Sequence, residues 1–182
     1  MEKMLIGEQG SLATLYGTEE KKGYVCLYIH GEGGQAQDAL TEARALLAQG
    51  YPVMAADLPE GDSAAYLRAL YDYAASRWSH ILLLAKGRSV RLCMESLSGT
   101  APEKALFLLP SADTAQSIDT WQVPTAVLLS SYDRTLDWQV ESALWSRFGA
   151  DLTLGSIHGT AGYAAQDLTA LDGWLYLALL NI

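Results

Sequence analysis

The sequence has little of what membrane, disulfide-rich and metal-binding proteins require. Among 182 residues there are only two cysteines, Cys26 and Cys93, too few for a disulfide framework or a metal site. Both lie in apolar runs, which predicts buried structural thiols. No apolar run reaches the roughly 18 residues of a membrane helix, and the N-terminus lacks the apolar stretch of a signal peptide. These absences predict a cytoplasmic protein with no membrane partner and no metal or organic cofactor.

Positive charge is also scarce, with 12 Lys and Arg against 21 Asp and Glu and a formal net charge of -9. This balance argues against nucleic acid as a main partner and leaves small neutral substrates open. Half of the residues are hydrophobic, which allows one large core. Repeats, low-complexity tracts and Pro/Ser-rich linkers are absent, so residues 1–182 are expected to form a single domain.

Apolar runs alternate with segments of helical period along the chain. Met4–Gly7 and Ser11–Tyr16 predict a hairpin around Gly10. Further strands are predicted at Tyr24–His30, Pro52–Ala56, Ile81–Ala85, Ala105–Leu109, Thr125–Ser130 and Leu152–Ile157, and helices at Asp38–Gln49, Ala64–Trp78, Ser89–Leu97, Leu136–Phe148 and Leu168–Leu180. This alternation predicts an α/β fold with a mainly parallel, doubly wound sheet and helices on both faces. Ligands bind such sheets at the carboxyl ends of the strands.

Three predicted strands are followed by the residue types of acyl-transfer chemistry. Ser89 comes shortly after one strand, Asp133 after the next-to-last strand and His158 directly after the last. A serine hydroxyl is a weak nucleophile until a base takes its proton, and a histidine can take that proton and return it to the leaving group. A carboxylate then orients the imidazole and stabilises its charged form. The three positions therefore predict a catalytic triad in the chain order Ser, Asp, His.

The motifs around these residues resemble the α/β-hydrolase superfamily over nearly the whole chain. Gly87-Arg88-Ser89-Val90 fits four of the five positions of the G-x-S-x-G nucleophile elbow. His30-Gly31-Glu32-Gly33-Gly34 resembles the HGxGG-type loop that supplies an oxyanion donor, and Asp57-Leu58-Pro59 resembles the D-x-P-G turn. The resemblance implies an α/β-hydrolase fold and a serine esterase-like activity.

The resemblance also assigns roles to individual residues. Ser89 would be the nucleophile, Asp133 the acid and His158 the base, with the backbone N–H groups of Glu32 and Val90 as the oxyanion hole. The supporting loop residues would be His30, Gly31, Gly33, Gly34 and Gly87. His30 would shape its loop and take no catalytic step.

The connection between the strands Ala105–Leu109 and Thr125–Ser130 is too short for the lid or cap domain that many members insert there. A lidless domain has an open site with little apolar surface for a long acyl chain. We therefore expect a small-molecule acyl substrate, cleaved at an ester, thioester or related bond through an acyl-enzyme. A homodimer partner could supply a missing wall.

Several features leave alternatives open. Ser89 could merely cap the helix that follows it, as serine often does. Asp133 and Asp137 both precede a predicted helix, where acids favour the positive end of the dipole, and Asp137 is the second choice for the acid. Arg91 stands where the elbow motif has a small residue, and the carboxylate of Glu32 would oppose an oxyanion. These two residues favour the alternative function, a catalytically weak or inactive binding protein on the same fold.

Overall fold

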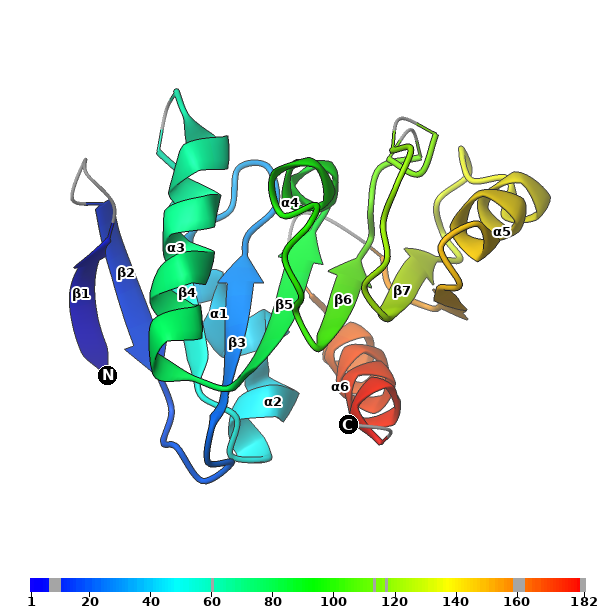
Figure 1. Cartoon of the computed structure of the whole chain (residues 1–182). Coiled ribbons are helices and arrows are strands. Elements are labelled where there is room, and N and C mark those ends of the chain that lie inside the picture. Colours follow the sequence, from blue (N-terminus) through cyan, green and yellow to red (C-terminus); the bar gives the residue numbers. More distant parts are fainter. Residues whose placement is uncertain (7–10, 60, 113, 117, 159–162, 181–182) are drawn as a thin grey trace.

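A computed structural model of the chain describes all residues except 7–10, 60, 113, 117, 159–162 and 181–182. The strands are β1 (Glu2–Ile6), β2 (Ser11–Tyr16), β3 (Tyr24–Ile29), β4 (Val53–Ala56), β5 (His80–Lys86), β6 (Lys104–Leu108), β7 (Thr125–Ser130) and β8 (Asp151–Gly155). The helices are the 3₁₀ turn η1 (Ala36–Asp38), α1 (Ala39–Glu42), α2 (Arg44–Ala48), α3 (Ser63–Arg77), α4 (Ser89–Ser96), α5 (Trp138–Ser146) and α6 (Ala165–Leu179). Helices α3, α4 and α5 cover one face of the sheet, and α1, α2 and α6 cover the other (Figure 1).

The eight strands form one sheet in the order β1-β2-β4-β3-β5-β6-β7-β8. The first two strands pair antiparallel, and β2 pairs antiparallel with β4. All the other pairs, from β4-β3 to β7-β8, are parallel. The predicted fold class, a mainly parallel sheet with helices on both faces, is confirmed. The hairpin strands are present, and the turn predicted at Gly10 lies outside the described residues.

The central strand β5 shows why a strand inside a parallel sheet is a continuous apolar run in the sequence. Ile81, Leu83 and Ala85 belong to the core between the sheet and helices α3 and α4. Leu82 and Leu84 alternate with them and belong to the core on the side of α2 and α6. Because β5 is covered on both faces, neither set of side chains can be polar without losing solvation.

Both cysteines are buried free thiols, as predicted. Burial raises the pKa of Cys26 to about 12, so this thiol stays protonated at neutral pH and is a poor nucleophile. Desolvation also raises the pKa of Cys93.

The segment predicted as one helix over Asp38–Gln49 is instead three short pieces, η1, α1 and α2. The break lies at Ala43, whose φ of -110° and ψ of 16° are not helical. Glu42, the residue before it, is 3% exposed, and its carboxylate points into the interior. Residue periodicity predicted helix and did not reveal that a buried carboxylate would interrupt it.

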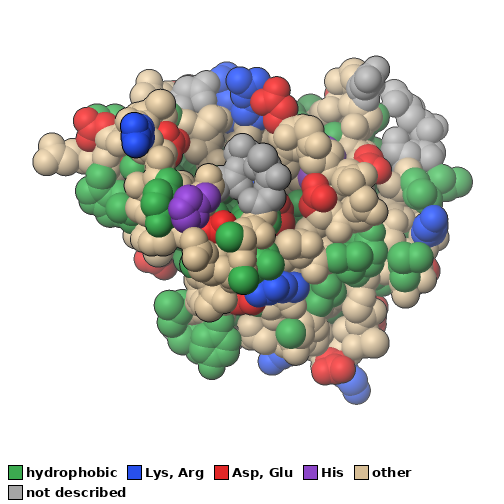
Figure 2. Space-filling view, turned by 180° about the vertical axis from the view of Figure 1, so that it is seen from behind, with side chains coloured by type: hydrophobic (Ala, Val, Ile, Leu, Met, Phe, Trp, Pro, Cys, Tyr) green, Lys and Arg blue, Asp and Glu red, His purple; other side chains and the backbone are tan. Residues whose placement is uncertain are grey.

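The face seen in Figure 2 carries apolar and charged side chains side by side. Helix α6 exposes three large side chains, Tyr176, Leu177 and Leu180 just beyond its end. Among the described residues, no helix is long and apolar enough to cross a membrane.

Candidate active site

The carboxyl ends of the strands frame a pocket of about 620 Å³. Its walls come from the segments that follow β3, β5, β6, β7 and β8 in the chain. The lining includes Gly31–Gly34, Lys86–Arg88, Leu109–Ser111, Asp133 and His158. Asp133, His158 and the glycine-rich loop therefore line a cavity at the edge of the sheet where ligands of this fold type bind.

His158 is held at the rim of this pocket by the start of α6. Its Nδ1 lies 2.9 Å from Oδ1 of Asp167, and its backbone N–H donates to the same oxygen at 3.2 Å. The imidazole stacks on Tyr132, with ring centroids 3.7 Å apart. Asp167 is 1% exposed, and its Oδ2 accepts the N–H of Ala164 at 2.9 Å. The hydrogen bond from His158 lowers the pKa of Asp167 below its usual value, so the carboxylate is charged at neutral pH.

Neither of the two predicted acids is the hydrogen-bond partner of His158 in this structure. Asp133 lines the pocket, but its Oδ1 accepts the backbone N–H of Thr135 at 2.9 Å and the Thr135 hydroxyl at 2.7 Å. Asp137 caps α5 by accepting the N–H groups of Gln139 and Val140. The triad acid Asp133 thus stays a prediction, and Asp167 is a functional candidate that the sequence analysis missed.

Little in the sequence could have identified Asp167. An acid in the first turn of a helix is ordinarily explained by the helix dipole. Asp167 lies at that position of α6, where its side chain also accepts the N–H of Ala164. Only its proximity to His158 distinguishes it, and that depends on the path of the chain between β8 and α6.

The turn between β5 and α4 is made by Gly87, whose φ is +58°. Arg88 already has helical dihedral angles, so Ser89 lies within the first turn of α4. Leu109 is the only non-glycine residue in the described part of the chain with positive φ, so Ser89 does not form the left-handed turn. The chain reverses direction two residues before the predicted nucleophile.

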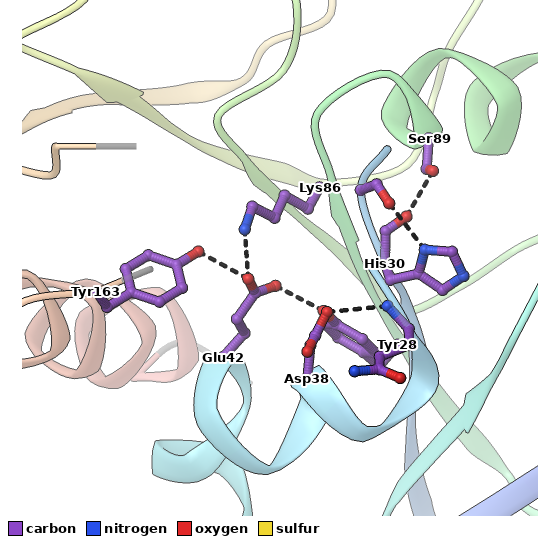
Figure 3. Close-up of polar contacts among 9 residues, drawn as sticks. Tyr28, His30, Asp38, Glu42, Lys86, Ser89 and Tyr163 are labelled. Atoms are coloured by element: carbon purple, nitrogen blue, oxygen red, sulfur yellow. Dashed lines mark hydrogen bonds and ion pairs between the residues drawn. The ribbon is translucent and has the colours of Figure 1, made fainter. Parts of the chain in front are cut away.

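Ser89 is 8% exposed, and its hydroxyl donates to the carbonyl oxygen of His30 at 2.6 Å (Figure 3). A hydroxyl has one proton to donate, so in this geometry it does not donate to His158. Ser89 is also not among the described residues that line the pocket. Its role as nucleophile stays a prediction, and the structure does not bring it together with the predicted base.

His30 organises the loop after β3, in keeping with its predicted role. Its Nδ1 donates to the carbonyl of Gly31 at 2.8 Å, and its Nε2 accepts the N–H of Leu58 at 3.3 Å. A Cβ at Gly34 would come within 2.9 Å of Asp38 Oδ2 and 3.1 Å of Gly31 O, so the loop has no room for a side chain there. Gly34 is therefore explained by close packing inside the loop, and Gly33 by its positive φ of +71°.

The two predicted oxyanion donors differ in their surroundings. Glu32 lines the pocket, and its carboxylate forms an exposed ion pair with Arg88, with 3.1 Å between Oε2 and Nη1. This pairing offsets the charge that would oppose an oxyanion. The N–H of Val90 donates to the carbonyl of Gly87 at 3.3 Å, inside the turn. Arg91 points outward and its Nε lies 2.8 Å from Glu95, so it does not obstruct the turn.

A buried polar cluster supports the pocket from below. Lys86 forms an ion pair with Glu42, which also accepts the hydroxyls of Tyr28 at 2.6 Å and Tyr163 at 2.8 Å (Figure 3). Burial raises the pKa of both tyrosines, so they remain hydrogen-bond donors. The cluster joins the end of β5 to α1 and to the segment before α6. Its members are far apart in the chain, so no sequence motif marks them as a cluster.

Comparison with known proteins supports the fold through structure alone. No family model matches the sequence, and no curated protein sequence matches it significantly. Est1E from Butyrivibrio proteoclasticus superposes with a TM-score of 0.75 at 14% identity, over 98% of this chain and 99% of that one. A lidless α/β serine hydrolase from Xanthomonas campestris gives 0.76 at 18% identity, over 100% and 95%. A carboxylesterase from Mesorhizobium loti gives 0.66 at 20% identity, over 97% and 99%.

These neighbours match the architecture described above over nearly their whole length. The connection between β6 and β7, residues 109–124, contains no helix or strand among its described residues, which accounts for the likeness to a lidless hydrolase. The chain has the fold of the α/β-hydrolase superfamily.

Proposed function

We propose that the chain hydrolyses a small ester or thioester in the pocket at the carboxyl edge of the sheet, with His158 as the general base. The observation that carries this proposal is the pairing of His158, which lines the pocket, with the buried carboxylate of Asp167. Structural neighbours named as a serine hydrolase and a carboxylesterase favour the same chemistry.

The pairing prepares His158 to accept a proton. Because Nδ1 donates to Asp167, the neutral imidazole carries its lone pair on Nε2. When Nε2 takes up a proton, the charged ring faces a carboxylate whose pKa is held low by this same hydrogen bond. Asp167 is then a positioning residue that also stabilises the imidazolium.

The reaction follows from this arrangement. The oxygen of the nucleophile bonds to the substrate carbonyl carbon, its proton passes to Nε2 of His158, and the carbonyl electron pair moves to the oxygen. On collapse of the tetrahedral species, the bond to the leaving oxygen or sulfur breaks, and the leaving group takes the proton from His158. The net reaction consumes one water and releases a carboxylic acid and an alcohol or thiol. In the predicted acyl-enzyme route Ser89 is the nucleophile, which requires its hydroxyl to leave the carbonyl of His30. Water then attacks the acyl carbon and gives a proton to His158, the bond to Ser89 breaks, and Ser89 takes the proton back as the acid leaves.

The size of the site limits the substrate. A pocket of about 620 Å³ lies within the ordinary range for small-molecule sites. With no lid over it, a long acyl chain would remain largely in water. We therefore propose a short acyl group as the substrate.

A second candidate function is ligand binding without turnover. The hydrogen bond from Ser89 to His30 favours it, because it leaves the predicted nucleophile turned away from the base. The same pocket would then hold an ester or a carboxylic acid without cleaving it.

Steady-state hydrolysis of 4-nitrophenyl acetate separates the two functions. His158→Gln is expected to lower kcat/KM by about 10²-fold or more, the usual contribution of a general base. The matched control is His80→Gln, because His80 pairs with Glu103 outside this pocket, and it should retain the wild-type rate. A wild-type rate equal to that of His158→Gln would contradict turnover and leave binding as the function.

A further inference from the structure

The position of the sharp turn after β5 deepens the proposed function, since it concerns the nucleophile of the same pocket. In α/β-hydrolases the nucleophile occupies a strained strand-to-helix turn that exposes its side chain above the sheet. In this chain the residue at that turn is Gly87, with φ of +58°, directly after β5 ends at Lys86. Gly87 lines the pocket together with His158.

The small residues around the turn agree with this placement. With Gly87 at the centre, the elbow reads Ala85-Lys86-Gly87-Arg88-Ser89, with small residues in its first and last positions. Ala85 and Ser89 are both buried, as close packing of a strand against a helix requires. Arg91 is then the third residue of α4 and lies beyond the elbow motif, where no small residue is needed, and its outward side chain is ordinary.

Ser89 has a structural role in this arrangement. Its hydroxyl donates to the carbonyl of His30 and so ties the first turn of α4 to the end of β3 (Figure 3). The N–H that follows the central residue of the elbow is that of Arg88, at the start of α4, where N–H groups lack partners within the helix. The oxyanion donor from this elbow would then be Arg88 in place of Val90.

We propose that Gly87 occupies the nucleophile position of this α/β-hydrolase fold, so that the chain forms no acyl-enzyme. Water held in the space of the missing side chain attacks the carbonyl carbon, gives its proton to Nε2 of His158 and ends in the carboxylic acid product. The leaving group takes that proton and departs as an alcohol or thiol. A Cβ at Gly87 would meet only the Cα of Gly31, at 3.9 Å, so the space for a side chain is present.

The test restores a hydroxyl at the turn. Wild type, Gly87→Ser and Gly87→Ala are treated with a fluorophosphonate probe, and the labelled residue is located by mass spectrometry. Gly87→Ala is the matched control, because it carries the same strain at positive φ without a hydroxyl. Circular dichroism and thermal melting establish that each variant is folded.

We expect a label at position 87 in Gly87→Ser, with loss of fluoride from phosphorus, at a rate at least 10²-fold above the background of Gly87→Ala. The label should be lost in the double variant Gly87→Ser/His158→Gln, because the hydroxyl proton must pass to His158. Wild type should carry no label at Ser89. Labelling of wild type at Ser89, or a folded Gly87→Ser that does not react, would overturn the inference.

These outcomes are independent of those that test the proposed function. If wild type hydrolyses no ester while Gly87→Ser is labelled, the placement of Gly87 at the nucleophile position stands, and the hydrolase proposal fails together with the water attack that rests on it. If wild type hydrolyses esters and is labelled at Ser89, the hydrolase proposal stands and the inference fails.

Discussion

Removing Lys86 should destabilise the protein strongly, because Lys86 is the only basic side chain paired with the buried Glu42 among the described residues. The two side chains are 13% and 4% exposed. Lys86→Met keeps the length of the aliphatic stem and leaves the Glu42 carboxylate with the hydroxyls of Tyr28 and Tyr163 as partners. Breaking a buried ion pair in this way costs about 3–5 kcal/mol.

For a chain of this length that cost corresponds to a fall in Tm of about 6–20 °C. Differential scanning calorimetry at neutral pH measures it. The matched control is Arg88→Met, which breaks an ion pair whose side chains are 75% and 70% exposed and should lower Tm by less than about 4 °C. Adding Glu42→Gln to Lys86→Met should recover part of the loss, since a neutral amide costs less to bury than a charge. A Lys86→Met melting point within about 2 °C of wild type would refute this reasoning.

Two further predictions concern residues around the pocket, and a third concerns the buried Glu141 of α5. Asp167→Asn should lower ester hydrolysis by far more than Asp133→Asn, because only Asp167 is hydrogen-bonded to His158; equal losses would contradict the assignment. Ser89→Ala should lower the free energy of unfolding by about 0.5–1.5 kcal/mol in urea, through loss of its bond to His30, and an unchanged midpoint would argue against a structural role. Desolvation raises the pKa of Glu141, so ionising it destabilises the fold as the pH rises above the carboxyl's usual value of about 4.3. Glu141→Gln should remove this loss of stability, so that its Tm falls less than that of wild type between pH 4 and 7. A dependence of Tm on pH equal to that of wild type would contradict the prediction.

Asp167 should give the stability of the fold a pH dependence opposite in sign to that of Glu141. Its pKa is lowered in the folded state by the bond to His158. Its contribution to stability is therefore complete above the unfolded value of about 3.9 and is lost as the pH falls through the lower folded value. Asp167→Asn should make acid unfolding less steep in a titration followed by circular dichroism, and a profile as steep as wild type would contradict this.

The order of strands and helices could be predicted from the sequence, because the parallel strands β3 to β7 are buried on both faces and are apolar runs in the sequence. The parallel edge strand β8 is largely exposed, and its prediction rested on a shorter apolar segment. Ser11–Tyr16 and Thr125–Ser130 were predicted with the observed bounds, and most other elements differ by one or two residues. The interrupted helix from Ala39 to Ala48 was not predicted, because the break accompanies a carboxylate bound to Lys86, a residue distant in the chain.

The edge of the sheet that holds the site was also predictable, since ligand sites follow the carboxyl ends of parallel strands. His158 and the glycine-rich loop after β3 line the observed pocket. The individual partners were not predictable. Whether Gly87 or Ser89 lies at the turn depends on the residue at which β5 ends. The two alternatives differ by only two residues, and neither the composition nor the apolar pattern of this segment distinguishes them. The contact between His158 and Asp167 depends on the path of the chain into α6.

Direct attack by water is tested by a rapid-quench experiment with excess 4-nitrophenyl acetate, followed by intact-mass and peptide mass spectrometry of the wild-type protein. We expect 4-nitrophenol and acetate to form in a reaction that depends on His158, while the peptide containing Ser89 gains no acetyl group at any time. An acetyl group on Ser89 that appears before steady state and decays at the rate of turnover would contradict it.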